Sequence, residues 1–582
     1  PYRNQSLQWM MVCLSYAGLL YLLAAFVEQW EDVATLRTVL VGLALAQAIW
    51  AFVQVAQGEM PRPSGTFFNP NFLAGYLATT SVLLLASLCY RKFWCSRSWA
   101  TWRGAIERIL PLVILSILLV ALLKTGSRGG ALALVVGTAL VIWLRFGRRG
   151  LIGLVFLVAV AALAPNPIRD RVVTEHVHNP AAYARWQMWQ SAINEIIEHP
   201  LGIGIGLYQY TYPRYAFPTE EEIVRYGKIA YTPHNEYLQM GIELGVVGLG
   251  IFLWGLVLVA RDALWLLRQR LTRRHRALAV GMCGAIVVIL TQAAVDSNLH
   301  EPALAILLTL CVGVVILGRT LCRKDVQPRW TIAIQRPVLW ATMGIVVIGL
   351  LTINVIRLGL AYQTYEAGTR LVKEQEVEQA IGSFQRAIFL DPGKSLYHHS
   401  LAAAYFQLYR RSHDQVMVQA SIGELRTAIA LNPLDGRLQG LLGFVSASQA
   451  SSLRRTELKD EDRRLIGQAV EAYERAAELE PFAYSHRLEL GRLMLVLGQR
   501  DAAEQHLKKV VELEPNYLPA REALTRLYAE SGRSEAAQHE FQEIVTRQQQ
   551  LQARPLNQLE ESFLRVDLTR LEVLLARKAS PT

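Results

Sequence analysis

Two kinds of hydrophobic pattern divide the chain. Up to about residue 357, apolar runs of roughly the length that crosses a bilayer, about 20 residues, alternate with short polar stretches. One polar stretch is much longer than the others, and it forms a loop at residues 165–236. The pattern predicts about ten transmembrane helices, at residues 7–27, 34–57, 70–90, 106–124, 129–146, 150–165, 236–260, 277–295, 301–318 and 337–357.

The remaining residues, 358–582, follow a different helical pattern. Ala380, Phe384, Ala387 and Pro392 have the spacing of the small, aromatic and proline positions of a tetratricopeptide repeat, and Gly368 stands at its small eighth position. No single repeat can bury its apolar face alone, so we predict about four or five repeats stacked into a superhelix. A generic helical bundle is the alternative. The pattern recurs in sets that end near Pro433, Pro481, Pro515 and Phe541.

The predicted fold class is therefore all-α, with a polytopic membrane domain at residues 1–357 and a repeat domain at residues 358–582. Basic residues cluster in loops that fall on one side when the helices are counted alternately, and the positive-inside rule makes that side cytoplasmic. The long loop and the repeats then lie outside the cytoplasm. The basic loop residues are Arg91, Lys92, Arg97 and Arg103, then Arg145, Arg148 and Arg149, then Arg268, Arg270, Arg273, Arg274 and Arg276, then Arg319, Arg323 and Lys324.

The same count of helices places Pro1 outside the cytoplasm. We therefore expect the sequence to begin inside a longer natural chain that has an odd number of further N-terminal helices. A cleaved signal is the alternative, although the first apolar run starts almost at once.

Composition narrows the class of protein. The chain of 582 residues is 52% hydrophobic, which is typical of a membrane protein with an attached domain. Its formal net charge of +11 does not predict nucleic-acid binding, because in the apolar part the Lys and Arg residues fall mainly in short loops. None of the six cysteines lies in the long loop or the repeats, and their spacing implies neither a disulfide framework nor a zinc site.

We place the candidate chemistry in the long loop. His234 follows Pro233 at the mouth of the apolar helix that begins near Tyr237. This is where water and bilayer meet, and it suits a reaction between a lipid-borne donor and a water-facing acceptor. Taken alone, such a histidine is more often a helix cap or an interfacial residue.

Two arginines share that side of the membrane. Arg128 stands in a glycine-rich turn, residues 125–130, where its guanidinium could grip phosphate; a lone arginine there is more often a snorkelling interfacial residue. Arg185 begins a predicted amphipathic helix at residues 183–197, whose apolar face carries Trp186, Trp189, Ile193 and Ile196. A solvated charge on a helix along the bilayer surface is the alternative for Arg185.

Two other histidine motifs are less informative. Residues 199–206 are rich in glycine, but no strand precedes them, so we interpret them as a close-packed turn rather than a dinucleotide site. His176 and His178 could form part of a metal site, but no carboxylate or cysteine spacing completes it. We expect no metal and no cofactor.

The order of these motifs resembles that of the O-antigen ligase and O-antigen polymerase superfamily over about residues 1–320. The resemblance implies a GT-C-type fold in the bacterial inner (cytoplasmic) membrane and transfer of a glycan from a polyprenyl-diphosphate carrier without a metal ion. It implies that Arg128 and Arg185 bind the donor diphosphate and that His234 is the catalytic base. The repeats depart from the minimal family pattern, so the acceptor stays open among a glycan, a lipid and a protein.

The chemistry of the reaction agrees with these residue types. Cleavage of a sugar–diphosphate bond builds negative charge on the leaving group, which guanidinium groups stabilise by charge-assisted hydrogen bonds. A histidine can accept the proton of the acceptor hydroxyl near neutral pH. A direct displacement would invert the anomeric centre.

Other functions remain open from the sequence. Within the same chemistry, the chain could be a polysaccharide polymerase or a protein O-oligosaccharyltransferase. A lipid or glycan transporter would usually carry ionisable groups in mid-membrane, and the predicted helices contain few. A membrane-anchored scaffold would need only the repeats, to which we assign either a protein partner or the acceptor.

Overall fold

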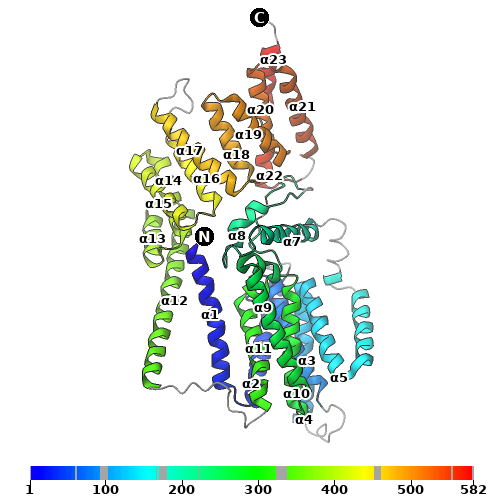
Figure 1. The fold of residues 1–582 in the computed structure, drawn as a ribbon. Helices are drawn as coiled ribbons and strands as arrows, with labels where there is room; N and C mark the ends of the chain where they lie inside the picture. Colours follow the sequence, from blue (N-terminus) through cyan, green and yellow to red (C-terminus); the bar gives the residue numbers. More distant parts are fainter. Residues whose placement is uncertain are drawn as a thin grey trace. The chain divides into compact units, whose positions relative to one another are not determined.

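The computed structural model describes residues 2–58, 62–91, 102–164, 167–169, 180–219, 222–227, 229–322, 337–450, 460–551 and 555–579. Within these ranges the regular secondary structure is helical, as predicted (Figure 1). Contacts divide the chain into two compact units. We name them the membrane unit, residues 9–203 and 232–333, and the repeat unit, residues 1–8, 204–231 and 334–582. The expected boundary at residue 357 stays a prediction, because the units interleave along the chain.

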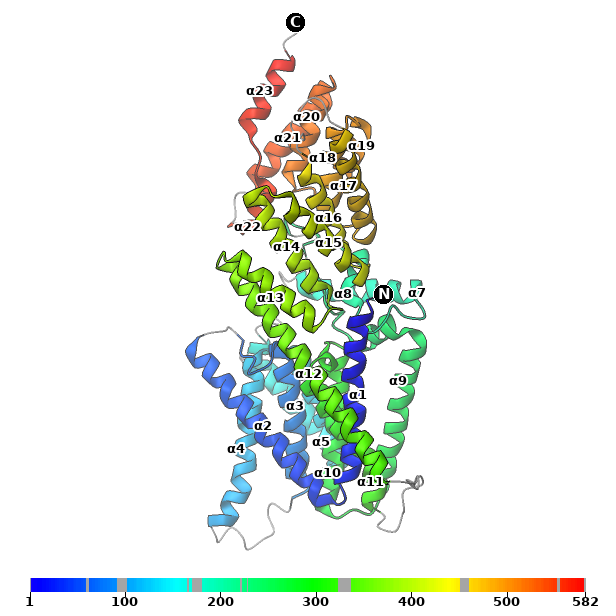
Figure 2. The same ribbon diagram turned by 90° about the vertical axis from the view of Figure 1, so that its left-hand side faces the viewer.

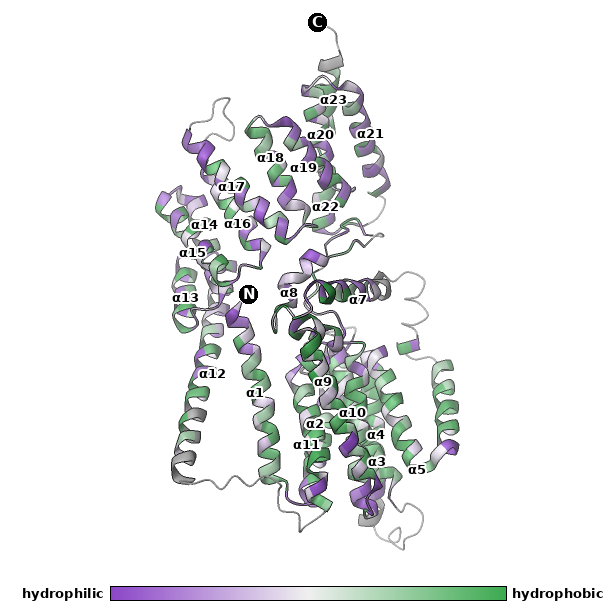
Figure 3. Cartoon of the chain, in the orientation of Figure 1, coloured by the Kyte–Doolittle hydropathy of each residue, from purple (hydrophilic) through white to green (hydrophobic). Residues whose placement is uncertain are grey.

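Most of the apolar helices belong to the membrane unit. Eight helices of the described chain are long and apolar enough to cross a membrane, and Figure 3 shows the high hydropathy of their residues in green. The elements are α1 (Arg3–Phe26), α2 (Trp30–Gln57), α3 (Pro70–Cys89), α4 (Trp102–Thr125), α5 (Arg128–Leu163), α7 (Pro180–Glu198), α9 (Glu236–Arg268), α10 (Arg273–Ala293), η3 (Asn298–His300) and α11 (Pro302–Cys322).

Helices α3 and α10 form the centre of this unit, and both are mostly buried. They pack against each other and against α5. Small residues allow the close approach: a Cβ at Gly137 of α5 would lie 2.3 Å from Val288 of α10, and a Cβ at Gly130 would lie 2.6 Å from Ala74 of α3. The core of the membrane unit therefore depends on glycine and alanine at helix crossings.

Three expected spans differ in detail from the observed helices. The predicted helices at residues 129–146 and 150–165 are two parts of α5, which is broken at Gly147 by a left-handed backbone (φ 63°, ψ −152°). The predicted span at residues 337–357 is the beginning of the longer helix α12 (Pro337–Lys373), which continues as the first helix of the repeats.

The repeat unit consists of stacked helical pairs (Figures 1 and 2). A small residue is needed at position 368, because a Cβ on Gly368 would lie 2.7 Å from the Phe384 ring. The same relation holds between Gly491 and Leu507, at 3.0 Å. The pairs are α12 with α13 (Val377–Leu390), α14 (Ser395–Ser412) with α15 (Gln415–Leu431), α16 (Gly436–Gln449) with α17 (Asp460–Leu479), α18 (Tyr484–Val496) with α19 (Arg500–Leu513), and α20 (Leu518–Glu530) with α21 (Ser534–Leu551); α22 (Gln558–Leu564) and α23 (Leu568–Ala579) follow.

Part of the long loop, residues 204–231, belongs to the repeat unit. It contains α8 (Tyr208–Thr211) and η2 (Tyr212–Tyr215). The Glu514 carboxylate accepts hydrogen bonds from the backbone N–H groups of Arg225 and Tyr226, each at 2.8 Å. Tyr226 stacks on Phe482, with ring centroids 5.1 Å apart. We call these contacts the loop clasp; the repeats hold a segment of their own chain.

Candidate active site

His234 lies where the long loop meets α9. The preceding loop backbone turns at His234 itself, which has a left-handed conformation (φ 50°) that few non-glycine residues adopt. Asn235 caps α9 by accepting hydrogen bonds from the N–H groups of Tyr237 and Leu238, at 3.0 and 3.1 Å. The Asn235 amide also donates to the Ala294 carbonyl, at 3.0 Å. The cap therefore fastens the His234 backbone to the segment that follows α10.

This arrangement brings the imidazole of His234 onto a buried carboxylate. The His234 Nδ1 lies 3.1 Å from Asp296 Oδ1, and the Asp296 side chain is only 5% exposed whereas the imidazole is 36% exposed. Asp296 Oδ1 also accepts from the Ser297 N–H, at 2.9 Å. A carboxylate that binds one ring nitrogen fixes the orientation of the imidazole and leaves Nε2 for other partners.

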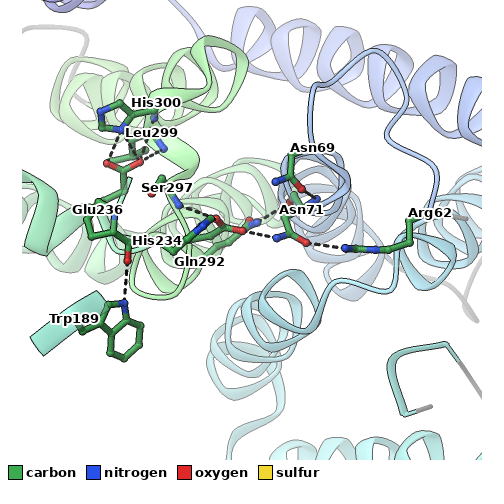
Figure 4. Close-up of polar contacts among 12 residues, drawn as sticks. Arg62, Asn69, Asn71, Trp189, His234, Glu236, Gln292, Ser297, Leu299 and His300 are labelled. Carbon is green, nitrogen blue, oxygen red and sulfur yellow. Dashed lines mark hydrogen bonds and ion pairs between the residues drawn. The ribbon is translucent and has the colours of Figure 1, made fainter. Parts of the chain in front are cut away.

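A chain of polar side chains continues from Asp296 to α3 and beyond (Figure 4). Asn71, in the first turn of α3, donates to Asp296 Oδ2 at 2.7 Å. The Arg62 guanidinium donates to Asn71 Oδ1 at 2.9 Å and, through Nε, to the Thr125 carbonyl at the end of α4 at 2.6 Å. Segments from four parts of the sequence therefore meet at one end of the membrane unit.

The charge of Asp296 follows from these neighbours. Burial alone would raise the pKa of its carboxyl group, but the hydrogen bond and charge of His234 outweigh it, with help from the Ser297 N–H and the charge of Arg185. The pKa of Asp296 is therefore held below its usual value. The carboxylate stays ionised at neutral pH and can support positive charge on the imidazole.

Arg185 reaches the same place from α7. The Trp189 indole, one helical turn after Arg185, donates to the Pro233 carbonyl at 3.1 Å, which fastens α7 beside His234 (Figure 4). The positive charge of Arg185 helps to lower the pKa of Asp296. The predicted helix at residues 183–197 is confirmed. Of its predicted apolar face, Trp186 and Ile193 are exposed, and the role of this face at a bilayer surface stays a prediction.

Arg128 is the first residue of α5. Its turn is closed by Ser127, whose Oγ accepts from the Gly130 N–H at 3.2 Å. The neighbouring Gly129 packs so closely that a Cβ would lie 3.1 Å from Val295, the residue before Asp296. The structure thus holds α7, which carries Arg185, against the loop before His234, and it places the helix turn that carries Arg128 against Val295, next to Asp296.

A second histidine–carboxylate pair lies on the first turn of α9. His300 Nδ1 is 3.0 Å from Glu236 Oε2, and Glu236 also accepts from the Leu299 and His300 N–H groups, at 2.6 and 3.1 Å (Figure 4). Burial would lower the pKa of His300, but the Glu236 charge and hydrogen bond raise it above its usual value. Gln239 approaches the other ring nitrogen at 2.9 Å. The pair anchors η3 to α9, directly after Asp296.

Sequence reasoning missed Arg62, Asn71, Asp296 and the pair of Glu236 with His300 as parts of the site. A signal was present, because the predicted topology puts residues 57–69 and 296–301 on the side of the long loop. Polar residues in short loops on that side are candidates for the site. His176 and His178 lie outside the described residues.

The turn at residues 199–206 is close-packed, as predicted. It presses its backbone into a break in α9, where Gly245 has φ 70° and ψ −179°. A Cβ at Gly245 would lie 2.4 Å from the Leu201 carbonyl carbon. The Val246 N–H donates to the Pro200 carbonyl at 2.9 Å, and the Ile203 N–H donates to the Ile242 carbonyl at 3.0 Å. This junction fixes where the long loop leaves α7.

Comparison with known proteins agrees with the geometry. The family model described as O-antigen ligase matches residues 112–253, a stretch that holds Arg128, Arg185 and His234 but ends before Asp296. This stretch of the chain is therefore similar to an O-antigen ligase domain. With its apolar helices, the chain is a multi-pass membrane protein.

One relative is similar to part of the chain. A protein of Rickettsia bellii (strain RML369-C), named for an inferred polysaccharide-ligase activity, is 29% identical over 189 residues. The match covers 30% of this chain and 42% of the relative, so the chain spans less than half of that protein's length.

A tetratricopeptide-repeat model matches residues 497–556. Among solved structures, a thermophilic tetratricopeptide-repeat protein of Thermus thermophilus is 21% identical, with a TM-score of 0.26, over 38% of this chain and 98% of that one. The Pseudomonas aeruginosa protein pilF is 15% identical, with a TM-score of 0.27, over 38% of this chain and 90% of that one.

Proposed function

We propose that the chain is a membrane glycosyltransferase that moves a glycan from a polyprenyl-diphosphate carrier to an acceptor outside the cytoplasm. The observation that carries the proposal is the contact of His234, which lies in the ligase-like stretch, with the buried Asp296 carboxylate. The positive charge of Arg185 acts on the same carboxylate. A histidine held by a carboxylate suits proton transfer, and nearby guanidinium groups suit a diphosphate.

The reaction would be a single displacement. The acceptor hydroxyl gives its proton to His234 Nε2 while its oxygen attacks the anomeric carbon of the donor sugar. A new carbon–oxygen bond forms as the bond from that carbon to the diphosphate oxygen breaks, so the configuration inverts. Asp296 holds Nδ1 and stabilises the imidazolium that results.

The diphosphate leaves with increased negative charge. Arg185 and Arg128 are the residues that we assign to it, because guanidinium groups bind phosphate oxygens in bidentate fashion. Arg62 has a different task in this proposal: its hydrogen bonds to Asn71 and to the Thr125 carbonyl hold the far side of the Asp296 network. The chain itself thus supplies positive charge for the leaving group.

We place the protein in the bacterial inner membrane, with the site and the repeats outside the cytoplasm. The basic loops at the ends opposite to Asp296 support this orientation. Labelling of a cysteine introduced at Ser531, from outside the inner membrane, tests it. Labelling only after the inner membrane is breached would contradict the orientation.

The function is tested with the full-length chain reconstituted in liposomes with a defined polyprenyl-diphosphate glycan. We expect a new glycosidic product, whose analysis separates transfer to a lipid core, polymerisation and transfer to a protein. Arg185→Gln and Arg128→Gln should weaken use of the donor, whereas Arg149→Gln, an exposed arginine beyond the Gly147 break of α5, should not. Movement of the donor across the membrane without glycosidic product would instead support a transporter.

A further inference from the structure

A second charged site lies at the other end of the membrane unit. A cavity of about 530 Å³ opens where the first part of α2, the end of α3 and the start of α10 meet. Helix α10 has 21 residues, so about 30 Å separates this cavity from the segment of Asp296. Among the described residues that line the cavity, none is a carboxylate and four are arginines: Arg37, Arg91, Arg273 and Arg274.

Arg37 is not explained by the usual charge bias of membrane proteins. That bias concerns the loops between helices, but Arg37 stands two turns inside α2, which begins at Trp30. Its guanidinium is partly buried and donates to the Ser87 hydroxyl of α3 at 2.8 Å. A charged side chain within a membrane helix usually marks a functional site.

The start of α10 is equally unusual. Its first turn carries Arg273, Arg274 and Arg276 directly after the N-cap Thr272. Positive side chains are unfavourable at the N-terminus of a helix, where the helix dipole is itself positive. The same end of a helix attracts anions, so a bound anion would offset both the dipole and the crowded guanidinium groups.

In the part of the chain that the structure describes, only weak ion pairs with carboxylates are found at these arginines. Glu31 lies 4.0 Å from Arg274 and Glu107 lies 3.7 Å from Arg91, and all four side chains are largely exposed. Exposed ion pairs of this length contribute little. Among the described residues, two carboxylates at 3.7 and 4.0 Å therefore pair with two of the four arginines. The remaining wall of the cavity is mostly apolar, with Leu84, Leu88 and Pro111.

We propose that this cavity binds the phosphate of an anionic ligand. Guanidinium groups match phosphate oxygens in geometry and charge, and the apolar wall would cover an attached hydrocarbon. Two sources share this chemistry: the headgroup of an anionic phospholipid and a soluble phosphate or diphosphate. The site is separate from the proposed donor site and does not depend on the proposed transfer reaction.

The test measures binding to the full-length protein by native mass spectrometry, with phosphatidylglycerol in one arm and inorganic pyrophosphate in lipid-free detergent in the other. We expect retention of one of these phosphates. Removal of each lining arginine should weaken binding about fivefold. The variant Arg37→Gln removes one of them, and the double variant Arg273→Gln with Arg274→Gln removes two. The arm in which binding is found identifies the source.

The matched control is the double variant Arg268→Gln with Arg270→Gln, which removes the same charge from exposed positions outside the cavity. It should bind as the wild type does. Equal loss of binding in the control and in the cavity variants would overturn the proposal, as would equal retention of zwitterionic phosphatidylcholine. Arg37→Lys keeps the charge and serves as a folded reference, in which binding should largely persist.

Discussion

Two buried carboxylates hold two points of the long loop, and they do so in different ways. In the membrane unit, Asp296 binds the imidazole of His234. In the repeat unit, Glu514 accepts two backbone N–H groups, those of Arg225 and Tyr226. The Asp296 contact depends on the identity of the side chain at position 234. The Glu514 contact is made to backbone groups and depends only on the backbone conformation.

The pKa values of Asp296 and Glu514 are shifted in opposite directions because their hydrogen-bond partners differ in charge. Burial raises the pKa of Glu514, and the hydrogen bonds from neutral N–H groups and the Arg225 charge recover only part of the cost. Burial acts on Asp296 in the same direction, but His234 and Arg185 reverse the shift and lower its pKa. Cationic partners keep a buried carboxylate ionised more effectively than neutral donors do. Asp296 is thus suited to proton transfer and Glu514 to anchoring.

The largest effect is expected when the His234 imidazole, which Asp296 binds, is removed. In His234→Ala the acceptor hydroxyl loses its base, which should reduce the transfer rate by about 10²- to 10⁴-fold in the reconstituted assay. His199→Ala, in the same loop, is the control and should retain normal rates. Full transfer by a normally inserted His234→Ala protein would exclude the proposed role.

The next prediction concerns the junction that delivers the loop to His234. In Gly245→Ala, a side chain enters a left-handed position and meets the Leu201 backbone at 2.4 Å, so we expect a loss of about 3 kcal/mol in the free energy of unfolding. Gly250→Ala is the control on the same helix, because nothing lies within 4 Å of its Cβ. Similar melting temperatures for both variants would contradict the close contact at the junction.

The sequence predicts the two units unequally. Helices and repeats follow from periodic positions, and Gly368 illustrates this, because its partner Phe384 lies within the same repeat. His234 and Arg185 could be identified as candidates because they lie in the long polar loop between apolar helices, on the side of the membrane where the chemistry is expected. The functions assigned to them remain predictions.

The contacts that complete the site are long-range. Asn71 and Asp296 are 225 positions apart, and neither belongs to a periodic pattern. The loop clasp was missed for the same reason: Arg225 and Glu514 are 289 positions apart. A role of the repeats in acceptor choice stays a prediction, but deletion of the repeats would also release residues 204–231. Loop variants are therefore a cleaner test than truncation.

A smaller effect is expected when the charge of the carboxylate beneath His234 is removed. In Asp296→Asn the imidazole loses a hydrogen bond to a charged group, which contributes about 1.5–3 kcal/mol, so transfer should fall by roughly 10- to 150-fold. Asp262→Asn, which breaks an ion pair with Arg319 at 2.8 Å, is the control. It should leave transfer unchanged.

The pH dependence gives the sign of the Asp296 contribution. Its folded pKa is lowered, so its stabilisation is present above the unfolded value of about 3.9 and is lost as the pH falls through the folded value. The melting temperatures of the wild type and Asp296→Asn should differ most at neutral pH and converge below about pH 4. A gap that widens in acid would contradict the lowered pKa.

The smallest and most local effect is expected at Glu514. In Glu514→Gln the side-chain amide can accept only one of the two N–H groups and leaves the other unsatisfied, a cost of about 1–3 kcal/mol. Hydrogen exchange at residues 222–227 of the full-length protein should therefore accelerate while the rest of the repeats stays protected. Glu512→Gln is the control, because its side chain is 67% exposed and pairs with Lys509. Unchanged exchange in Glu514→Gln would show that the clasp does not depend on the carboxylate.

The same variant distinguishes the two carboxylates by pH. Because the folded pKa of Glu514 is raised, its contribution is fully present below the unfolded value of about 4.3 and declines as the pH rises through the folded value. The stability of the wild type relative to Glu514→Gln should therefore fall as the pH rises from about 4 to neutral, opposite to the trend for Asp296→Asn. Parallel trends for the two variants would mean that neutral N–H donors and a cationic imidazole stabilise their carboxylates equally, and the distinction between a chemical contact and an anchoring contact would be lost.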